Sequence, residues 1–370
     1  GLKNKHARYL EHKGGSEMQL RDILQYSVEH EASDVYIVPG SPVMLKVRGV
    51  MQSYSDARVL PDESERLISE MYQGVHHHTL EGLKNTGDDD FSFSIPTVGR
   101  FRCNTYMQRG TLAAVLRVVA FELPDYKKLR IPETVIDLAR KQNGLILVTG
   151  PAGSGKSTTM ACIIDRINHE RSGHIITLED PIEYLHPHRK SVVSQREIML
   201  DTQTFAHALR AALRQAPDVI MLGEMRDFET MQTAITASET GHLLISSLHT
   251  LGAAKTIDRI VDVFPANQQQ QIRTQLSMVL QAVVSQQLIT AKNGEIIPVF
   301  EIMITNSAIQ NMIREGKIHQ LDNAIYAGAA QGMVSMDNEL VRLVKEGAID
   351  KETAVKHALN MEMMARKLGA

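Results

Sequence analysis

One stretch of the sequence decides the fold, and it reads Gly150-Pro151-Ala152-Gly153-Ser154-Gly155-Lys156-Ser157-Thr158. It matches the phosphate-binding loop G-x-x-x-x-G-K-[ST] at every fixed position. The apolar run Leu145–Thr149 precedes it, and apolar residues at helical spacing follow it up to Ile167. A strand, a glycine-rich loop and a helix in this order direct backbone N–H groups and the positive helix end at phosphate oxygens. The stretch predicts a nucleoside triphosphate site in which Lys156 reaches the β- and γ-phosphates and Ser157 ligates Mg²⁺.

The size and composition of the chain set the frame for this site. Its 370 residues suggest two or three domains, and 43% hydrophobic residues allow ordinary cores. The net charge of −3 does not indicate a nucleic-acid binder. The two cysteines, Cys103 and Cys162, are too few for a four-cysteine zinc site and fit a reducing compartment. Because no apolar run approaches the roughly 18 residues of a transmembrane helix and no signal peptide opens the chain, we expect a cytosolic protein, peripheral to the membrane.

Residue patterning divides the chain into five predicted segments. From Gly144 onward strands alternate with helices, which predicts an α/β fold: a mostly parallel sheet with helices on both faces and ligands at the carboxyl ends of its strands. Within this region we expect a helix over Gln268–Leu288 and a strand over Pro298–Ile304. The predicted segments are a flexible leader (1–17), an α+β domain (18–124), a linker (125–143), the α/β core (144–305) and a helical C-terminal region (306–370).

Two acidic clusters follow strands of the α/β core. Three carboxylates occur within Glu179-Asp180-Pro181-Ile182-Glu183, where they are costly beside a phosphate site unless a cation or a proton transfer uses them. A solvated acidic loop is the alternative interpretation. Glu224 follows the strand Val219–Leu222, at the position where an acid contacts Mg²⁺ or its water. Asp227 is better explained as a helix cap.

Histidines occur at two further places. His242 and His249 bracket the strand predicted over Leu243–Ser247, and each is either a satisfied structural histidine or a residue that senses or relays hydrolysis. The run His76-His77-His78 suggests a metal site. Three adjacent positions on a helix point in different directions and cannot chelate one ion together, so a solvated surface run is the favoured interpretation.

In this order, the clusters resemble those of the retraction ATPases of type IV pili, within the larger secretion-ATPase superfamily. The resemblance is dense from about Arg100 to Arg314. After the phosphate-binding loop it comprises the acidic box Thr177–Tyr184, then Ser194–Glu197, Ala208–Arg214, Pro217–Ile220, Gly223–Asp227, and the histidine box Thr240–Thr250.

This resemblance implies an N-terminal PAS-like α+β domain followed by a RecA-like P-loop ATPase domain with a helical C-terminal region. It implies a homohexamer with nucleotide between the two domains. Glu183 matches the catalytic glutamate, Glu224 the second acidic site, which positions Mg²⁺ through water, and His242 and His249 the histidine box.

The resemblance also matches Arg100, Arg102 and Arg117 to basic residues of the N-terminal domain that approach the phosphates. Arg100 and Arg102 alternate along a predicted strand and therefore share one of its faces. A solvated strand face is the alternative interpretation, above all for Arg100.

Two departures from the family pattern concern Ala152 and Gln310. Ala152 stands where relatives often have Thr, at a position that supplies backbone only. Gln310 replaces a charged residue in the C-terminal retraction motif, here Ala308–Ile313, which affects coupling to the pilus machine rather than hydrolysis. Extension and type II secretion ATPases usually carry a tetracysteine zinc element and a longer N-terminal region. The sequence has neither, which favours retraction.

We therefore expect a hexameric motor that uses ATP and Mg²⁺ to power type IV pilus retraction at the cytoplasmic face of the inner membrane. Its expected partners are an inner-membrane pilus platform protein and other pilus ATPases, with no nucleic acid. A related secretion or pilus-assembly ATPase and an accessory retraction ATPase are the nearest alternatives. A RecA-like nucleic-acid translocase and a non-catalytic nucleotide-binding regulator are the alternatives from other functional classes.

Overall fold

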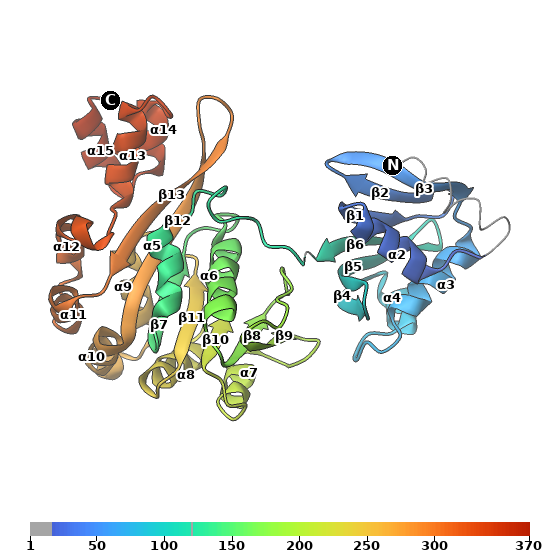
Figure 1. The fold of residues 1–370 in the computed structure, drawn as a ribbon, viewed down its shortest axis with the longest axis horizontal. Helices are drawn as coiled ribbons and strands as arrows, with labels where there is room; N and C mark the ends of the chain where they lie inside the picture. Colours follow the sequence, from blue (N-terminus) through green and yellow to red (C-terminus); the bar gives the residue numbers. More distant parts are fainter. Residues whose placement is uncertain (1–16, 120) are drawn as a thin grey trace. The chain divides into compact units, whose positions relative to one another are not determined.

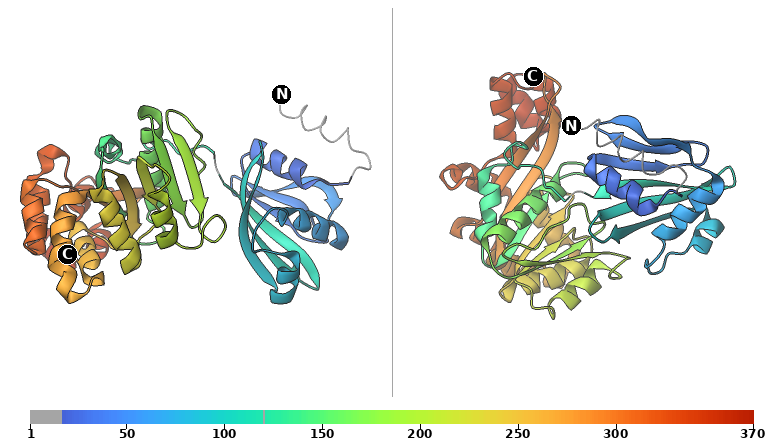
Figure 2. Two further views of the ribbon diagram at one scale, coloured as in Figure 1. Left: turned by 90° about the horizontal axis from the view of Figure 1, so that it is seen from below. Right: turned by 45° about the vertical axis from the view of Figure 1, so that its right-hand side comes forward.

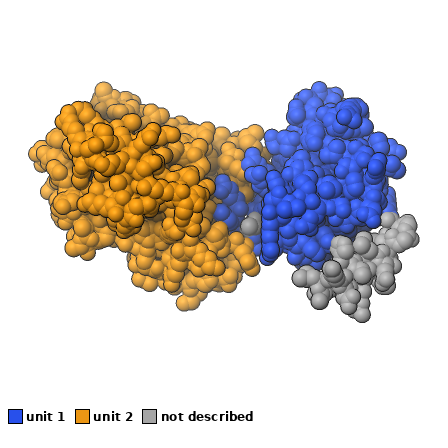
Figure 3. Space-filling model, turned by 90° about the horizontal axis from the view of Figure 1, so that it is seen from above, with its two compact units in different colours: residues 1–121, 183–185 blue, residues 122–182, 186–370 orange. Residues whose placement is uncertain are grey.

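The structure is a computed structural model that describes residues 17–119 and 121–370 (Figure 1). The chain forms two compact units, coloured separately in Figure 3: one up to Phe121 with residues 183–185, the other formed by 122–182 and 186–370. The leader expected over residues 1–17 lies, apart from Glu17, outside the described residues. Among the helices that are described, none is long and apolar enough to span a bilayer.

The first unit is an antiparallel sheet in the order β3-β2-β1-β6-β5-β4, with helices packed on it (Figure 1). Its core joins Ile23 and Leu24 of α2 and Leu67 of α3 to strand residues such as Phe101. Alternation along β5 leaves Phe101 buried and Arg102 exposed, as the sequence pattern predicts. The elements are α2 (Leu20–Glu29), β1 (Ala32–Ile37), β2 (Pro42–Val47), β3 (Val50–Arg58), α3 (Pro61–Met71), α4 (Leu80–Thr86), β4 (Asp88–Ile95), β5 (Gly99–Gln108) and β6 (Thr111–Val119).

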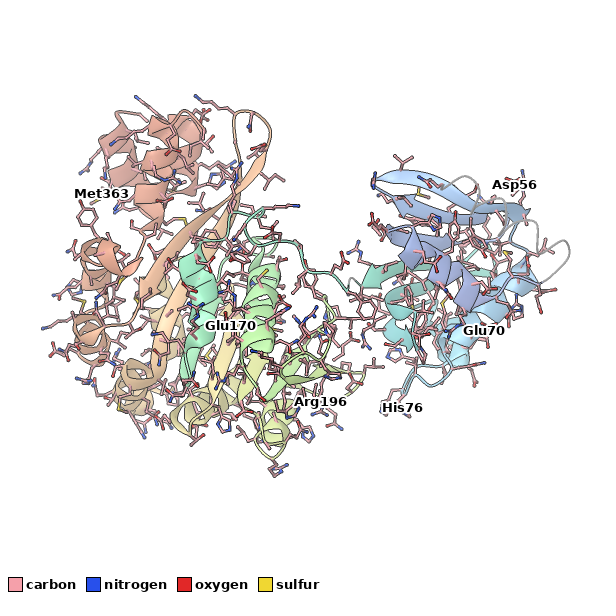
Figure 4. All side chains as sticks on the ribbon, in the orientation of Figure 1. Asp56, Glu70, His76, Glu170, Arg196 and Met363 are labelled. Atoms are coloured by element: carbon pink, nitrogen blue, oxygen red, sulfur yellow. The ribbon has the colours of Figure 1, made fainter. Side chains whose placement is uncertain are left out.

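The histidine run does not lie on a helix, contrary to the expectation from the sequence. Residues 76 and 77 form a turn between α3 and α4, residue 78 follows it without regular secondary structure, and His76 is labelled in Figure 4. His78 is half-buried, with its Nδ1 2.9 Å from Oδ1 of Asp89. At least this one of the three histidines is therefore an internal partner rather than a solvated surface residue.

The second unit is built on a seven-stranded sheet in the order β13-β12-β7-β11-β10-β8-β9. Every neighbouring pair is parallel except β12 and β13. The strand that precedes the phosphate-binding loop is thus central. The strands are β7 (Gly144–Thr149), β8 (His174–Glu179), β9 (Val192–Glu197), β10 (Val219–Leu222), β11 (Leu243–Leu248), β12 (Leu280–Thr290) and β13 (Ile296–Ile304).

Helices cover both faces of this sheet (Figures 1 and 2). In β7, Leu145 and Leu147 belong to the core on one face, whereas Ile146 and Val148 belong to the core on the other. Strands buried on both faces explain why these runs are continuously apolar. The first face carries α7 (Phe205–Ala212), α8 (Phe228–Glu239), α9 (Ala253–Val263), α10 (Gln269–Val279), α11 (Ser307–Arg314) and α12 (Leu321–Ala327), and the second α5 (Glu133–Ile136) and α6 (Lys156–Glu170).

Polar side chains fix where many of these helices begin. Asp227 caps α8 by accepting the backbone N–H of Thr230 at 2.9 Å, as the sequence indicates. The same arrangement begins α7 at Thr204 and α11 at Asn306. It also begins the three C-terminal helices, α13 (Met336–Lys345), α14 (Lys351–His357) and α15 (Met361–Leu368), at Ser335, Asp350 and Asn360. These helices pack on the far part of the β12–β13 hairpin (Figure 1).

The helix predicted over Gln268–Leu288 is wrong in its second half. Helix α10 ends at Val279, and from Leu280 the chain runs directly into β12. The β-branched pair Val283 and Val284 is placed between β7 and β13, where burial on both faces outweighs the helical spacing of the preceding residues.

Candidate nucleotide-binding site

The loop Gly150–Thr158 joins the fully buried strand β7 to α6, which runs from Lys156 to Glu170 (Figure 4). Its first and sixth residues lie against β12. A Cβ at Gly150 would lie 2.2 Å from the backbone oxygen of Gln286, and one at Gly155 would lie 2.9 Å from Nε2 of Gln286. Gly155 also adopts φ +89°, a conformation that L side chains rarely adopt. Glycine is thus required at both positions.

The loop has the features of an anion cradle. No side chain caps the N-terminus of α6, so its first backbone N–H groups remain available to a ligand. Oγ of Ser154 is buried and lacks a hydrogen-bond partner among the described residues. A buried hydroxyl without a partner is unfavourable unless a ligand supplies one. These features fit the phosphates of a nucleotide.

Lys156 is nearly buried at the start of α6. Its Nζ donates to the carbonyl oxygen of Gly150 at 2.5 Å and to that of Pro151 at 3.2 Å. Burial lowers the pKa of the Lys156 ammonium, and the negative charge of Glu224 acts in the opposite direction. These two contacts with carbonyl oxygens hold the Lys156 side chain close to the loop.

Three neighbouring strands deliver the residues that surround Lys156. Nζ of Lys156 lies 3.1 Å from Nδ1 of His249, and Nε2 of that ring lies 3.1 Å from Oε2 of Glu224. Arg226 approaches the other carboxylate oxygen of Glu224, with Nη2 2.9 Å from Oε1. A neutral His249 satisfies both contacts, because Nδ1 accepts from the ammonium while Nε2–H donates to the carboxylate. Since β7, β11 and β10 are adjacent and parallel, their carboxyl ends bring these side chains together.

His242 lies at the other end of β11 from His249, since the two histidines bracket this strand. It precedes β11, whereas His249 follows it, so a six-residue strand of roughly 20 Å separates them. Nδ1 of His242 is 3.0 Å from the carbonyl oxygen of Ala237, to which it can donate. The two histidines of the histidine box thus lie at opposite ends of β11, and of the two only His249 contacts Lys156.

The acidic box is divided between two environments. Glu179 is buried, and its Oε2 accepts from the Thr177 hydroxyl at 2.7 Å and from the Gln195 amide at 3.1 Å. Glu179 is therefore engaged in hydrogen bonds inside the second unit. Asp180 and Glu183 are both exposed. The assignment of Glu183 as catalytic base stays a prediction.

The predicted basic residues lie on strands of the first unit. Arg102 of β5 and Arg117 of β6 are register partners and are both exposed, and Asp34 of β1 is the partner of Arg117 on its other side. Nε of Arg117 lies 3.4 Å from Oδ1 of Asp34. Arg100 shares the face of Arg102 and donates to Oγ of Ser94 at 3.1 Å. Two cations directly opposite each other are unfavourable, and Asp34 offsets part of this repulsion at Arg117.

Sequence reasoning missed the part of the site that β12 contributes. Oγ of Ser285 lies 2.7 Å from Oγ1 of Thr149, the residue before the phosphate-binding loop, and accepts the backbone N–H of Gly252 at 2.7 Å. Gln286 contacts the loop itself through its side chain. The detectable signal was the polar run Ser285-Gln286-Gln287 inside an apolar segment, which the helix prediction obscured.

A mostly parallel sheet with a phosphate-binding loop after a central strand, and an acid after β10, defines a P-loop nucleotide-binding enzyme of the RecA-like class. More narrowly, the chain belongs to the type II/IV secretion system protein family, whose model matches residues 10–366.

Individual relatives agree with this membership. The chain is 41% identical over 341 residues to the type IV pilus retraction ATPase PilT of Pseudomonas aeruginosa, covering 92% of this chain and 98% of that protein. It is 44% identical over 324 residues to a twitching motility protein of Neisseria gonorrhoeae, covering 87% and 86%. The crystal structure of the pilus retraction motor PilT with bound ADP matches with a TM-score of 0.80 at 44% identity, covering 95% and 100%.

These similarities confirm the fold class predicted from the sequence: an N-terminal PAS-like α+β domain followed by a RecA-like ATPase domain with a helical C-terminal region. The chain is an ATPase that binds nucleotide.

Proposed function

We propose that this ATPase powers the retraction of type IV pili, as a homohexamer at the cytoplasmic face of the inner membrane. The observation that carries the proposal is the similarity, over nearly the full length of both chains, to the retraction ATPase of Pseudomonas aeruginosa. An inner-membrane pilus platform protein is the partner to which the motor would transmit force, and other pilus ATPases are further candidate partners.

Within the site, the chain holds the phosphates with the backbone of Gly150–Thr158 and with the Lys156 ammonium. The Ser157 hydroxyl, exposed in the first turn of α6, and the Glu224 carboxylate, through water, are the groups that would hold Mg²⁺. Bound Mg²⁺ supplies charge neutralisation at the β- and γ-phosphates. His249 fixes Glu224 relative to Lys156 through its two ring nitrogens.

Glu183 is proposed to take the proton of the attacking water, the role of its match in the family. Arg102 and Arg117 are proposed to place positive charge against the phosphates, and their position opposite each other on an exposed strand face supports this. His242 is proposed to act as part of the histidine box, from the end of β11 opposite to His249.

The test combines chemistry with motility. The purified chain should form a hexamer and hydrolyse ATP, and Lys156→Ala should abolish turnover because the loop loses its only cation toward the phosphates. Expression in a bacterium that lacks its retraction ATPase should restore twitching, and the Lys156→Ala variant should not.

Other outcomes would identify the alternatives. Normal hydrolysis without restored twitching, but with restored pilus assembly or secretion, would contradict retraction in favour of a related secretion ATPase. A turnover that rises with added DNA and falls again with salt would indicate a nucleic-acid translocase. A verified hexamer without measurable turnover would indicate a regulator.

A further inference from the structure

Strand β12 carries three consecutive polar residues in an otherwise apolar interior. Ser285, Gln286 and Gln287 are 0%, 2% and 6% exposed. Buried amides and hydroxyls are unfavourable unless they are hydrogen-bonded, so each of these side chains needs a specific partner. Where those partners lie shows what each residue does.

The side-chain amide of Gln286 bridges two points of the phosphate-binding segment. Its Nε2 donates to the carbonyl oxygen of Ser154 at 2.7 Å, and its Oε1 accepts from the Thr159 hydroxyl at 2.7 Å. Ser154 lies in the loop and Thr159 in the first turn of α6, so the two anchored residues lie on either side of Lys156 along the chain. One amide therefore holds both ends of the segment that contains the lysine.

The loop also lies too close to Gln286 to move toward it. A Cβ at Gly150 or at Gly155 would approach atoms of Gln286 to less than 3 Å, as described above. The close approach and the two hydrogen bonds all act within residues 150–159. Together they limit the movement of the loop on the side that faces β12. The side chain of Gln286 cannot move away without breaking both hydrogen bonds.

We infer that Gln286 is a positioning residue for ATP hydrolysis: its amide sets the shape of the phosphate-binding loop and thereby the place of the Lys156 ammonium. Gln286 contacts the loop carbonyl and the Thr159 hydroxyl, not the atoms that react. Because small misplacements of catalytic groups reduce rates steeply, a loosened loop should lose both nucleotide affinity and turnover.

The neighbouring residue provides a matched control. Gln287 has the same side chain, is similarly buried, and points to the opposite face of the strand. Its Nε2 also donates to a backbone carbonyl oxygen, that of His357 at the end of α14, at 2.8 Å. Gln286→Ala and Gln287→Ala thus each remove a buried amide from adjacent positions, but only the first removes contacts with the phosphate-binding segment.

The experiment uses the full chain and measures the Kd for ADP, the kcat and KM for ATP, and the thermal midpoint of both variants. We expect similar decreases in the midpoint. Gln286→Ala should bind ADP about tenfold more weakly and lose at least as much in kcat/KM, whereas Gln287→Ala should keep the affinity of the unmodified chain. Equal ADP affinities in the two variants would overturn the inference.

A second comparison keeps the test decisive if Gln286→Ala folds poorly. Thr159→Val removes the hydroxyl that donates to Oε1 and preserves the shape of the side chain. Since Thr159 and Gln286 act through one amide, combining Thr159→Val with Gln286→Glu should weaken ADP binding by much less than the product of the two single effects. Independent, multiplying effects would show that the amide does not join the two points.

Discussion

Nζ of Lys156 lies 3.1 Å from Nδ1 of His249. The lysine begins α6 after β7, and the histidine follows the neighbouring strand β11, so the contact joins the phosphate-binding loop to the histidine box. On its other side the imidazole reaches Glu224. The imidazole of His249 therefore connects side chains that follow the three adjacent strands β7, β11 and β10, so a displacement of Lys156 by the phosphates can be transmitted to Glu224.

His249→Ala should lower kcat for ATP by about tenfold to a hundredfold, because Lys156 and Glu224 lose the group that fixes their relation. The affinity for ADP should change less, since the loop backbone remains intact. Turnover and ADP binding of the purified chain measure both effects. His319→Ala, which removes an exposed histidine of the C-terminal region, serves as control. Equal kcat values for the two variants would remove His249 from the site.

Glu183→Gln should abolish ATP turnover while nucleotide binding is retained, because the amide keeps the size of the side chain but cannot take a proton. Binding of ADP and steady-state hydrolysis separate these effects. Asp180→Asn is the matched comparison, since Asp180 is also an exposed acid of the same box. If Asp180→Asn abolishes turnover and Glu183→Gln does not, the base has been assigned to the wrong residue.

How far the sequence leads depends on whether a feature is local. The phosphate-binding loop, the buried strand before it and the Asp227 cap are encoded within a few residues, and each lies where the pattern places it. The edge strand β3 could not be predicted in this way, because most of its residues are exposed and show no apolar alternation.

Features that depend on distant partners could not be predicted. Gln286 meets Thr159 from 127 positions away, a pairing that follows from β12 lying beside β7. His242 and His249 are seven positions apart in sequence, yet they lie at opposite ends of the extended strand β11. Only the strand order reveals which of them reaches Lys156.

Arg102→Ala and Arg117→Ala should each lower kcat by about a hundredfold or more, because cations that approach a transferring phosphoryl group commonly contribute several powers of ten. The affinity for ADP should fall by a smaller factor. Arg48→Ala is the control, since Arg48 is an exposed arginine of the same unit that pairs with Glu31. Unchanged turnover in both Arg102→Ala and Arg117→Ala would show that the two arginines are solvated surface residues with no role in hydrolysis.

The buried carboxyl group of Glu301 should make the free energy of unfolding depend on pH. It is 2% exposed, and its carboxylate accepts backbone N–H groups of Ala253 at 2.8 Å and Met336 at 3.3 Å, at the starts of α9 and α13. Burial raises the pKa of Glu301 from 4.5 to about 7, against the opposing effect of these two N–H groups. Between these two pH values the folded chain keeps a proton that the unfolded chain releases, so the free energy of unfolding should fall as pH rises and level off above pH 7.

The full decrease should be roughly 3 kcal/mol, since each pKa unit corresponds to about 1.4 kcal/mol. Glu301→Gln cannot titrate, and its free energy of unfolding should change with pH less than that of the unmodified chain by about this amount. Urea unfolding at several pH values from about 5 to 8 measures the difference. Glu352→Gln, at an exposed position of α14, should keep the original slope. A Glu301→Gln variant whose stability follows pH as steeply as the unmodified chain would mean that Glu301 is already ionised throughout this range.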